Sequence, residues 1–395
     1  MLIKEKVAQA VEILRECDVD CWLTFVRETG INGDPSLAFL VDGTLTWHSA
    51  LIVTKSGETI AIVGRYDRKS VEDLGVYTRV IDFVEGIRAP LLETLGRLRP
   101  RSIAVNYSRD SEICDGLTHG MYLTLVDMLT EIGLQDRLTQ ADRIVSALRQ
   151  RKTDGELERI RRAIAATEEI FAAAGDFIRA GVTEREIAAF MKEGAERRGM
   201  PFAWDAATCP AVFTGPDTAS AHYAPTDRKV EEGHIVNMDF GLKHDGYCSD
   251  LQRTFYVLRK GEDAAPADVL HGFTTVMTAV EESRRAMRPG VTGRAVDAVA
   301  RGIVVREGFA EFPHGLGHQV GRFVHDGTAL LGPPWEKYGI KPTVPLEERM
   351  VFTLEPSVAV PGRGNATIEE MVVVTGEGAD YLSTPQRSII CLPRG

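Results

Sequence analysis

A weak internal repeat limits the fold of this chain more than any other feature. The pentapeptide GVTER at 181–185 recurs as GVTGR at 290–294, an offset of 109 residues, and at the same offset Gly199 matches Gly308. Each copy is typical of a helix, a Gly-Val-Thr cap, a second helix ended by glycine, and later a pair of strands. A five-residue match could arise by chance, but the shared context favours a duplication. We therefore expect two similar halves about a pseudo-twofold axis, with a site at their junction.

The region before the repeat has a different pattern, and at 395 residues the chain is long enough for two domains. We expect an α/β N-terminal domain at 1–148 and an α+β domain at 149–395. The capping-box spacing of Thr153 and Glu156 predicts a long helix that ends near residue 180. No chemically active cluster occurs before it, so the first domain is expected to shape a pocket or an oligomer interface. Its predicted elements are a helix at about 3–16, strands in CWLTFV, on both sides of the Ser56-Gly57 turn and in SIAVNYS, and a helix in MYLTLVDMLTEIG.

Charge and cysteine usage exclude several partners and compartments. The net charge is −11, from 57 acidic and 46 basic residues, and no dense Lys/Arg run occurs, which argues against nucleic acid or an anionic membrane as a main partner. The N-terminus alternates charged and apolar residues and is not typical of a signal peptide, and no apolar stretch reaches membrane-spanning length. The six cysteines form no CxxC pair, so we expect reduced thiols and a cytoplasmic location.

Two aspartates lie in a predicted β-hairpin of the first half. In HIVNMDFGLKHDGYCSDLQRTFYV, a turn on Asp245-Gly246 places Asp239 opposite Gln252, with Asp250 on the same face. A turn shifted by one residue to 244–245 would place the two aspartates opposite each other, again on one face. Two solvated aspartates are the simpler alternative, but the strand around Asp239 looks buried. Buried like charges repel unless a cation lies between them.

The second half has a similar pair of glutamates. RMVFTLEPSVAV and ATIEEMVVVT flank PGRGN, and a loop centred on Gly362 keeps Glu355 and Glu369 on one face, while Glu370 points the opposite way. Four carboxylates and one imidazole would suit two divalent ions, which in such sites lie about 3.5–4 Å apart and generate a bridging hydroxide.

The segment HGLGHQVGRFVH, at 314–325, supplies the candidate imidazoles. His314 and His318 have the spacing of a helical HExxH zinc site, but no glutamate follows the first histidine. Gly315 and Gly317 each lower helix propensity by about 1 kcal/mol relative to alanine, so a loop or an extended segment is expected. Spacing alone leaves open which of His314, His318 and His325 would bind a metal.

Motifs in the second domain resemble one known family. Residues 150–395 are similar to the pita-bread metallopeptidases, which include Xaa-Pro aminopeptidases, Xaa-Pro dipeptidases (prolidases), methionine aminopeptidases and the metal-free creatinases. The α/β domain resembles the N-terminal domain of the creatinase and prolidase branch. In family order, the motifs are HYAPTDRKVEEG, NMDFG, GYCSDLQRTF, HGLGHQVGRFVHD, TLEPS and IEEM.

The resemblance implies a pita-bread catalytic domain with pseudo-twofold symmetry, and it implies roles for individual residues. Its dinuclear metal ligands would be Asp239, Asp250, His318, Glu355 and Glu369. His222 and His325 would be the substrate-side histidines, and His314 a pocket histidine. The family is commonly homodimeric. Two positions depart from the common pattern: Thr367 stands where arginine is frequent, and Gln252 where threonine is frequent.

The implied activity is hydrolysis of an Xaa-Pro bond by a metal-bridging hydroxide, on a small peptide with proline in second position. Glu355 would carry the proton to the prolyl nitrogen, and His222 and His325 would hydrogen-bond the substrate. The ligand set suits Mn²⁺, with Co²⁺ or Zn²⁺ as alternatives. The length and Arg322, a candidate partner for the free proline carboxylate, favour a dipeptidase. A solvated surface arginine is the alternative for Arg322.

Other functions remain open at this point. An Xaa-Pro aminopeptidase acting on longer peptides is the main alternative. A creatinase-like amidinohydrolase or a non-catalytic binding module would share the fold, but the complete ligand set argues against both. A two-metal phosphoesterase is disfavoured because no Gly/Lys-rich phosphate loop occurs.

Overall fold

A computed structural model of the protein describes residues 2–216 and 223–393. The chain divides into two compact units, Met1–Arg149 and Gln150–Gly395. No helix within the described ranges has the length and apolar content that a membrane crossing requires. All six cysteines lie in the described ranges and all are free thiols, as expected from their spacing.

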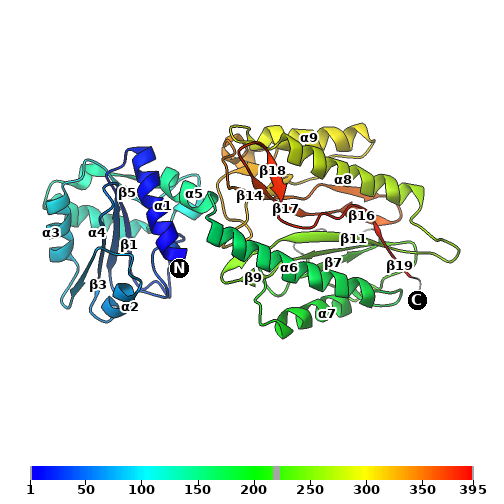
Figure 1. Cartoon of the computed structure of the whole chain (residues 1–395), viewed down its shortest axis with the longest axis horizontal. Coiled ribbons are helices and arrows are strands. Elements are labelled where there is room, and N and C mark those ends of the chain that lie inside the picture. The colour runs from blue at the N-terminus through cyan, green and yellow to red at the C-terminus, as the bar shows by residue number, and fades with distance from the viewer. Residues whose placement is uncertain (1, 217–222, 394–395) are drawn as a thin grey trace. The chain divides into compact units, whose positions relative to one another are not determined.

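The first unit is a six-stranded mixed sheet in the order β4-β3-β2-β1-β5-β6 (Figure 1). Every residue of β1, β2 and β3 is buried, because helices pack on both faces of the sheet. Alternate side chains of one strand therefore enter two separate cores: Trp22 packs with the cluster that includes Leu14, and Leu23 with the cluster that includes Leu125. The strands are β1 Cys21–Val26, β2 Ser49–Thr54, β3 Thr59–Gly64, β4 Arg79–Phe83, β5 Ile103–Val105 and β6 Leu138–Gln140.

The helices of this unit confirm part of the sequence prediction and add to it. The helices expected at 3–16 and in MYLTLVDMLTEIG are present as α1 and α4, whereas α2, α3 and α5 were not predicted. The helices are α1 Leu2–Cys17, α2 Arg68–Asp73, α3 Arg88–Leu98, α4 His119–Thr130 and α5 Asp142–Gln150.

The second unit confirms the repeat. Its helices are α6 Asp154–Phe177, α7 Glu184–Arg197, α8 Ala267–Ala286 and α9 Gly293–Arg306. The offset of 109 residues carries both ends of α7 onto the ends of α9, and the end of α6 onto the end of α8. Thr153 and Thr183 cap α6 and α7 through capping boxes, whereas Thr292 caps α9 without a side-chain hydrogen bond. Figure 1 shows α6 and α7 on one side of the strands of this unit and α8 and α9 on the other.

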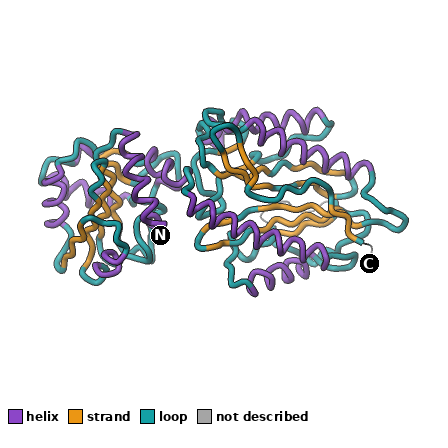
Figure 2. Tube along the Cα trace, viewed as in Figure 1, coloured by secondary structure: helices purple, strands orange, loops and turns teal. Residues whose placement is uncertain are grey.

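The strands of the second unit lie between these helix pairs, as Figure 2 shows in orange between purple helices. The first half contributes β7, β8 and β11 to a four-stranded sheet in the order β19-β11-β8-β7, whose edge strand β19 comes from the C-terminal end of the chain. The second half contributes the three-stranded sheet β14-β17-β18. Three two-stranded pairs, β9-β10, β12-β13 and β15-β16, complete the unit. The strands are β7 Ala211–Thr214, β8 Ile235–Phe240, β9 Lys243–His244, β10 Tyr247–Cys248, β11 Leu251–Val257, β12 Gly317–His318, β13 Leu330–Leu331, β14 Val351–Leu354, β15 Ser357–Val360, β16 Gly364–Thr367, β17 Glu370–Val374, β18 Ala379–Tyr381 and β19 Ile390–Leu392.

Candidate metal centre

The first-half hairpin has the register expected from its Asp-Gly turn. Asp245 and Gly246 both have positive φ, 46° and 80°, which is typical of the tight turns that join twisted antiparallel strands. Asp239 in β8 pairs with Gln252 in β11, and Asp250 lies two residues before Gln252. Side chains alternate along a strand, so both aspartates face the same side. Both are buried, with relative exposures of 9% for Asp239 and 6% for Asp250.

The second-half hairpin is centred on Gly362. Leu354 pairs with Glu370 in one ladder and Ser357 with Thr367 in the other, so the common register sets Glu355 opposite Glu369 in the gap between the ladders. Glu369 is almost fully buried, and the Glu355 side chain is 17% exposed.

A single antiparallel bridge joins the two hairpins. The main chains of Gln252 and Glu369 exchange two hydrogen bonds, each 3.3 Å long. Cross-strand neighbours point to the same face of a sheet, so Asp239, Gln252, Glu369 and Glu355 form one row across the junction of the halves. With Asp250 beside this row, the four acids (Asp239, Asp250, Glu355 and Glu369) form a buried acid cluster. The sequence prediction that they converge on one face is confirmed.

His318 faces the acid cluster from β12. Its Nε2 lies 3.4 Å from Glu355 Oε1 and 3.6 Å from Asp250 Oδ2. Its Nδ1 lies 2.8 Å from the Val324 carbonyl oxygen, to which an Nδ1–H would donate. This leaves the Nε2 lone pair for a cation, in the arrangement that orients metal-binding histidines in general. Ligand atoms of Asp250, His318 and Glu369 all lie within 4.8 Å of one another.

The four carboxyl groups of the acid cluster all have raised pKa values, because their charged forms are disfavoured. Burial raises the pKa of Asp239 to about 7. Burial, followed by repulsion from other acids of the cluster, raises the pKa values of Asp250, Glu355 and Glu369 well above their usual range. A hydrogen bond from the Gln252 side chain opposes the shift at Glu369, but it is the smaller effect.

Two carboxylate oxygens of the cluster also lack a hydrogen-bond donor. Within the described residues, Asp239 Oδ1 and Glu369 Oε2 are buried without any such partner. An ionised, unpaired carboxylate costs several kcal/mol to bury, and a coordinated cation removes that cost. Oxygen donors with one imidazole also match the preferences of divalent ions such as Mn²⁺, Co²⁺ and Zn²⁺. The residues present therefore fit a metal site.

The other predicted site residues lie at different places. His325 is exposed and its ring packs edge-on against His318, with centroids 4.3 Å apart. His314 Nε2 lies 3.2 Å from Ser357 Oγ, and burial lowers the pKa of His314, which favours the neutral ring. The Arg322 guanidinium lies over the ring of Tyr247, 5.4 Å from its centroid. His222 lies outside the described residues.

Sequence reasoning missed an ion pair that supports the histidine segment. Lys152 Nζ lies 3.7 Å from Asp326 Oδ2, and both side chains are almost completely buried. The same Asp326 oxygen accepts the main-chain N–H of Arg322, at 2.9 Å. The carboxylate therefore closes the loop that follows His318. The sequence signal was Asp326, the one acidic residue in the glycine-rich segment 314–332.

Comparison with known proteins agrees with this site. Residues 158–376, more than half of the chain, match metallopeptidase family M24. The chain is 32% identical over 252 residues to a protein named probable dipeptidase PepE in Mycobacterium bovis, a match that covers 63% of each chain. Dipeptidase PepE from Mycobacterium ulcerans superposes with a TM-score of 0.74 at 27% identity, covering 99% of this chain and 98% of that one. X-Pro aminopeptidase from Thermotoga maritima superposes with a TM-score of 0.70 at 26% identity, covering 98% and 99%.

These similarities extend over both units, so the fold is the expected pita-bread catalytic unit preceded by an α/β domain. The family match spans Asp239, Asp250, His318, Glu355 and Glu369. The chain belongs to metallopeptidase family M24.

Proposed function

We propose that the protein is an Xaa-Pro dipeptidase whose acid cluster and His318 together hold two divalent metal ions. The observation that supports this most strongly is the convergence of four buried, mutually repelling carboxylates and one oriented imidazole on one face. Asp250, His318 and Glu369 have the mutual spacing of one cation site. Asp239 and Glu355 then supply the further oxygen donors that a second ion needs. Mn²⁺ is the proposed native ion, with Co²⁺ and Zn²⁺ as alternatives.

Bound ions would supply Lewis acidity and a water nucleophile that is deprotonated near neutral pH. Glu355 is the proposed proton carrier, because its Oε1 lies 3.4 Å from His318 Nε2, among the groups that would hold the ions. It accepts a proton from the attacking water and delivers it to the prolyl nitrogen, which must be protonated to leave.

Two histidines are proposed to bind the substrate. His325, exposed beside His318, donates a hydrogen bond to the carbonyl oxygen of the scissile bond, and His222 is proposed to act with it. His314 is proposed to line the pocket next to Ser357. Proline is a suitable second residue because its ring restricts φ and its nitrogen carries no hydrogen in the peptide bond. This removes the need for an acceptor that would bind a substrate N–H.

The preference for dipeptides over longer peptides is supported by the relatives named dipeptidase and by Arg322 as a carboxylate partner. In the structure this guanidinium lies over the ring of Tyr247. An Xaa-Pro aminopeptidase is the second candidate, favoured by the similarity to the Thermotoga maritima enzyme. We further propose a cytoplasmic homodimer, the location being supported by six free cysteines.

The test is to strip the protein of metal, add back Mn²⁺, Co²⁺ or Zn²⁺ singly, and follow cleavage of Gly-Pro and Gly-Pro-Ala. The proposal expects no cleavage without metal and restored cleavage of Gly-Pro, with Gly-Pro-Ala a poor substrate. Cleavage of the first bond of the tripeptide, without cleavage of the dipeptide, would make the protein an aminopeptidase. Undiminished cleavage by the metal-free protein would overturn the metal mechanism altogether.

A further inference from the structure

The junction between the two halves is held by little main-chain pairing next to the acid cluster. Gln252 and Glu369 form an isolated bridge rather than part of a longer ladder, and both of its hydrogen bonds are long, at 3.3 Å. The bridge nevertheless sets how far Asp239, paired with Gln252, lies from Glu355, which faces Glu369. A further contact that holds this bridge would therefore position the ligands of both halves.

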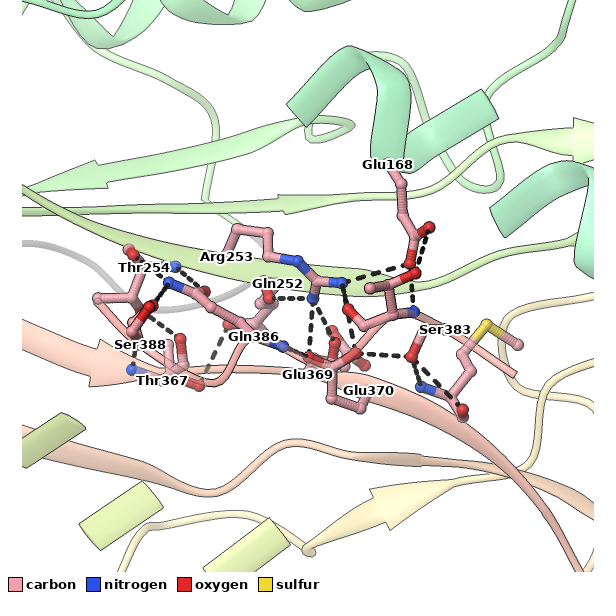
Figure 3. A network of polar contacts seen from close by, with 12 residues as sticks. Glu168, Gln252, Arg253, Thr254, Thr367, Glu369, Glu370, Ser383, Gln386 and Ser388 are labelled. Carbon is pink, nitrogen blue, oxygen red and sulfur yellow. Dashed lines mark hydrogen bonds and ion pairs between the residues drawn. The ribbon is translucent and has the colours of Figure 1, made fainter. Parts of the chain in front are cut away.

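Arg253 makes that contact from the opposite face of the sheet. Its Nη1 donates to the carbonyl oxygens of both bridge residues, at 2.9 Å for Gln252 and 3.2 Å for Glu369 (Figure 3). Its Nη2 donates to the Thr384 carbonyl oxygen at 2.9 Å. The side chain is only 7% exposed. A planar guanidinium can bind several acceptors at fixed angles, which a lysine ammonium cannot do.

A buried carboxylate balances the charge of the guanidinium. Glu370 Oε1 lies 3.1 Å from Arg253 Nη1, and the Glu370 side chain is fully buried. Glu370 also accepts the Ser383 hydroxyl at 2.6 Å and the Gln386 main-chain N–H at 2.8 Å. Glu168 of α6 adds a second negative charge 3.6 Å from Arg253 Nη2, as Figure 3 shows.

We propose that Arg253 is a positioning residue for the metal centre, which clamps the Gln252 and Glu369 carbonyls and so holds the acids of the two halves at metal-binding distance. This inference rests on the proposed function in that it needs a metal site, but it assigns the clamp to residues that touch neither metal nor substrate. Gln252 and Glu369 point toward the acid cluster, and their sequence neighbours Arg253 and Glu370 point away from it, because side chains alternate along each strand. Arg253 and Glu370 thus form a charge-balanced ion pair on the face of the sheet opposite the acid cluster.

The test compares Mn²⁺ binding by isothermal titration calorimetry in wild type, E370Q and R253M/E370Q. E370Q keeps the guanidinium on both carbonyls, with Glu168 as its remaining counter-charge. R253M/E370Q removes the clamp without leaving a buried unpaired charge, so it is expected to fold. R284M/E281Q is the matched control, because Arg284 also pairs with a glutamate and donates to a main-chain carbonyl, that of Ala379 in β18.

The proposal expects the Mn²⁺ dissociation constant of E370Q and R284M/E281Q to stay within about threefold of wild type. For R253M/E370Q it expects weakening of at least tenfold, as is common when the support of a metal ligand is lost. The melting temperature of each metal-free variant is measured alongside, to confirm that the chain is folded. Equal Mn²⁺ affinity in E370Q and R253M/E370Q would overturn the clamp. Absence of Mn²⁺ binding by the wild type would instead overturn the proposed metal centre, so the two failures are distinguishable.

Discussion

Gln252 stands between the two halves of the catalytic unit: it pairs with Asp239 across β8 and β11 and bridges Glu369 on its other side. The resulting row of side chains, together with Asp250 beside it, places four carboxylates on one buried face. The Oε1 of Gln252 also accepts the Thr367 hydroxyl at 3.3 Å. The two positions that depart from the common family pattern therefore contact each other. Mutual repulsion among the acids is relieved by cations or by protonation, so the metal-free and metal-bound proteins are physically different states.

The stability of the metal-free protein is expected to fall as pH rises. The pKa of Asp239 is raised to about 7 in the folded chain, whereas an unfolded aspartate titrates near 3.9. The stabilisation from this proton is therefore fully present below about pH 4 and is lost progressively as pH rises to about 7. In EDTA, the melting temperature should fall between pH 5 and 8, and D239N should flatten this dependence and raise the value at pH 8 by about 3–8 °C. D263N, at an exposed aspartate, is the control; a slope unchanged in D239N would contradict the prediction.

The close approach of β12 to β14 should make Gly317 irreplaceable. A Cβ at Gly317 would lie 2.0 Å from the Thr353 carbonyl oxygen, which belongs to the main chain and cannot rotate away. G317A is expected to cost about 1–3 kcal/mol of unfolding free energy and, by moving His318, to weaken Mn²⁺ binding at least about tenfold. G302A, in α9 with open space around its Cβ, should instead stabilise by about 0.5–1 kcal/mol. Urea denaturation and calorimetry measure both effects, and equal behaviour of the two variants would refute the expectation.

Breaking the Lys152–Asp326 pair should destabilise the unit more than removing both charges. K152M removes the cation 3.7 Å from the buried Asp326 carboxylate, which costs about 3–5 kcal/mol. K152M/D326N restores neutrality, and we expect it to recover more than half of that loss in urea denaturation. K337M, at an exposed lysine, serves as the control. A double variant no more stable than K152M would show that loss of charge balance is not the cause of the K152M destabilisation.

His325 should be separable from metal binding. Its ring contacts His318 but is exposed, and its proposed role is to bind the reacting carbonyl. H325N is expected to lower kcat on Gly-Pro by about 10²–10³-fold, the range found when a donor to a developing oxyanion is lost. Its Mn²⁺ content, measured by atomic absorption, should equal that of wild type. H271N, on α8, is the control, and metal loss in H325N would assign this histidine to the metal centre instead.

Local features of this protein could be predicted from the sequence because they depend on short-range geometry. The Asp245-Gly246 turn and the loop centred on Gly362 determine register, and a two-residue side-chain period then decides which acids share a face. Capping threonines likewise mark where α6 and α7 begin, and the matching offsets of α7 and α9 confirm the structural repeat.

Tertiary structure decided which residues meet across long stretches of chain. That Gln252 bridges Glu369, that His318 rather than His314 faces the acids, and that Lys152 reaches Asp326 all depend on how the two halves pack. Arg253 and Arg322 show the same limit: their neighbours along the chain do not reveal that one guanidinium clamps two carbonyls and the other covers Tyr247. Dihedral preferences and side-chain periodicity act within a few residues, whereas these contacts result from burying two apolar faces against each other. That burial is non-directional, so no local pattern in the sequence specifies which apolar faces meet.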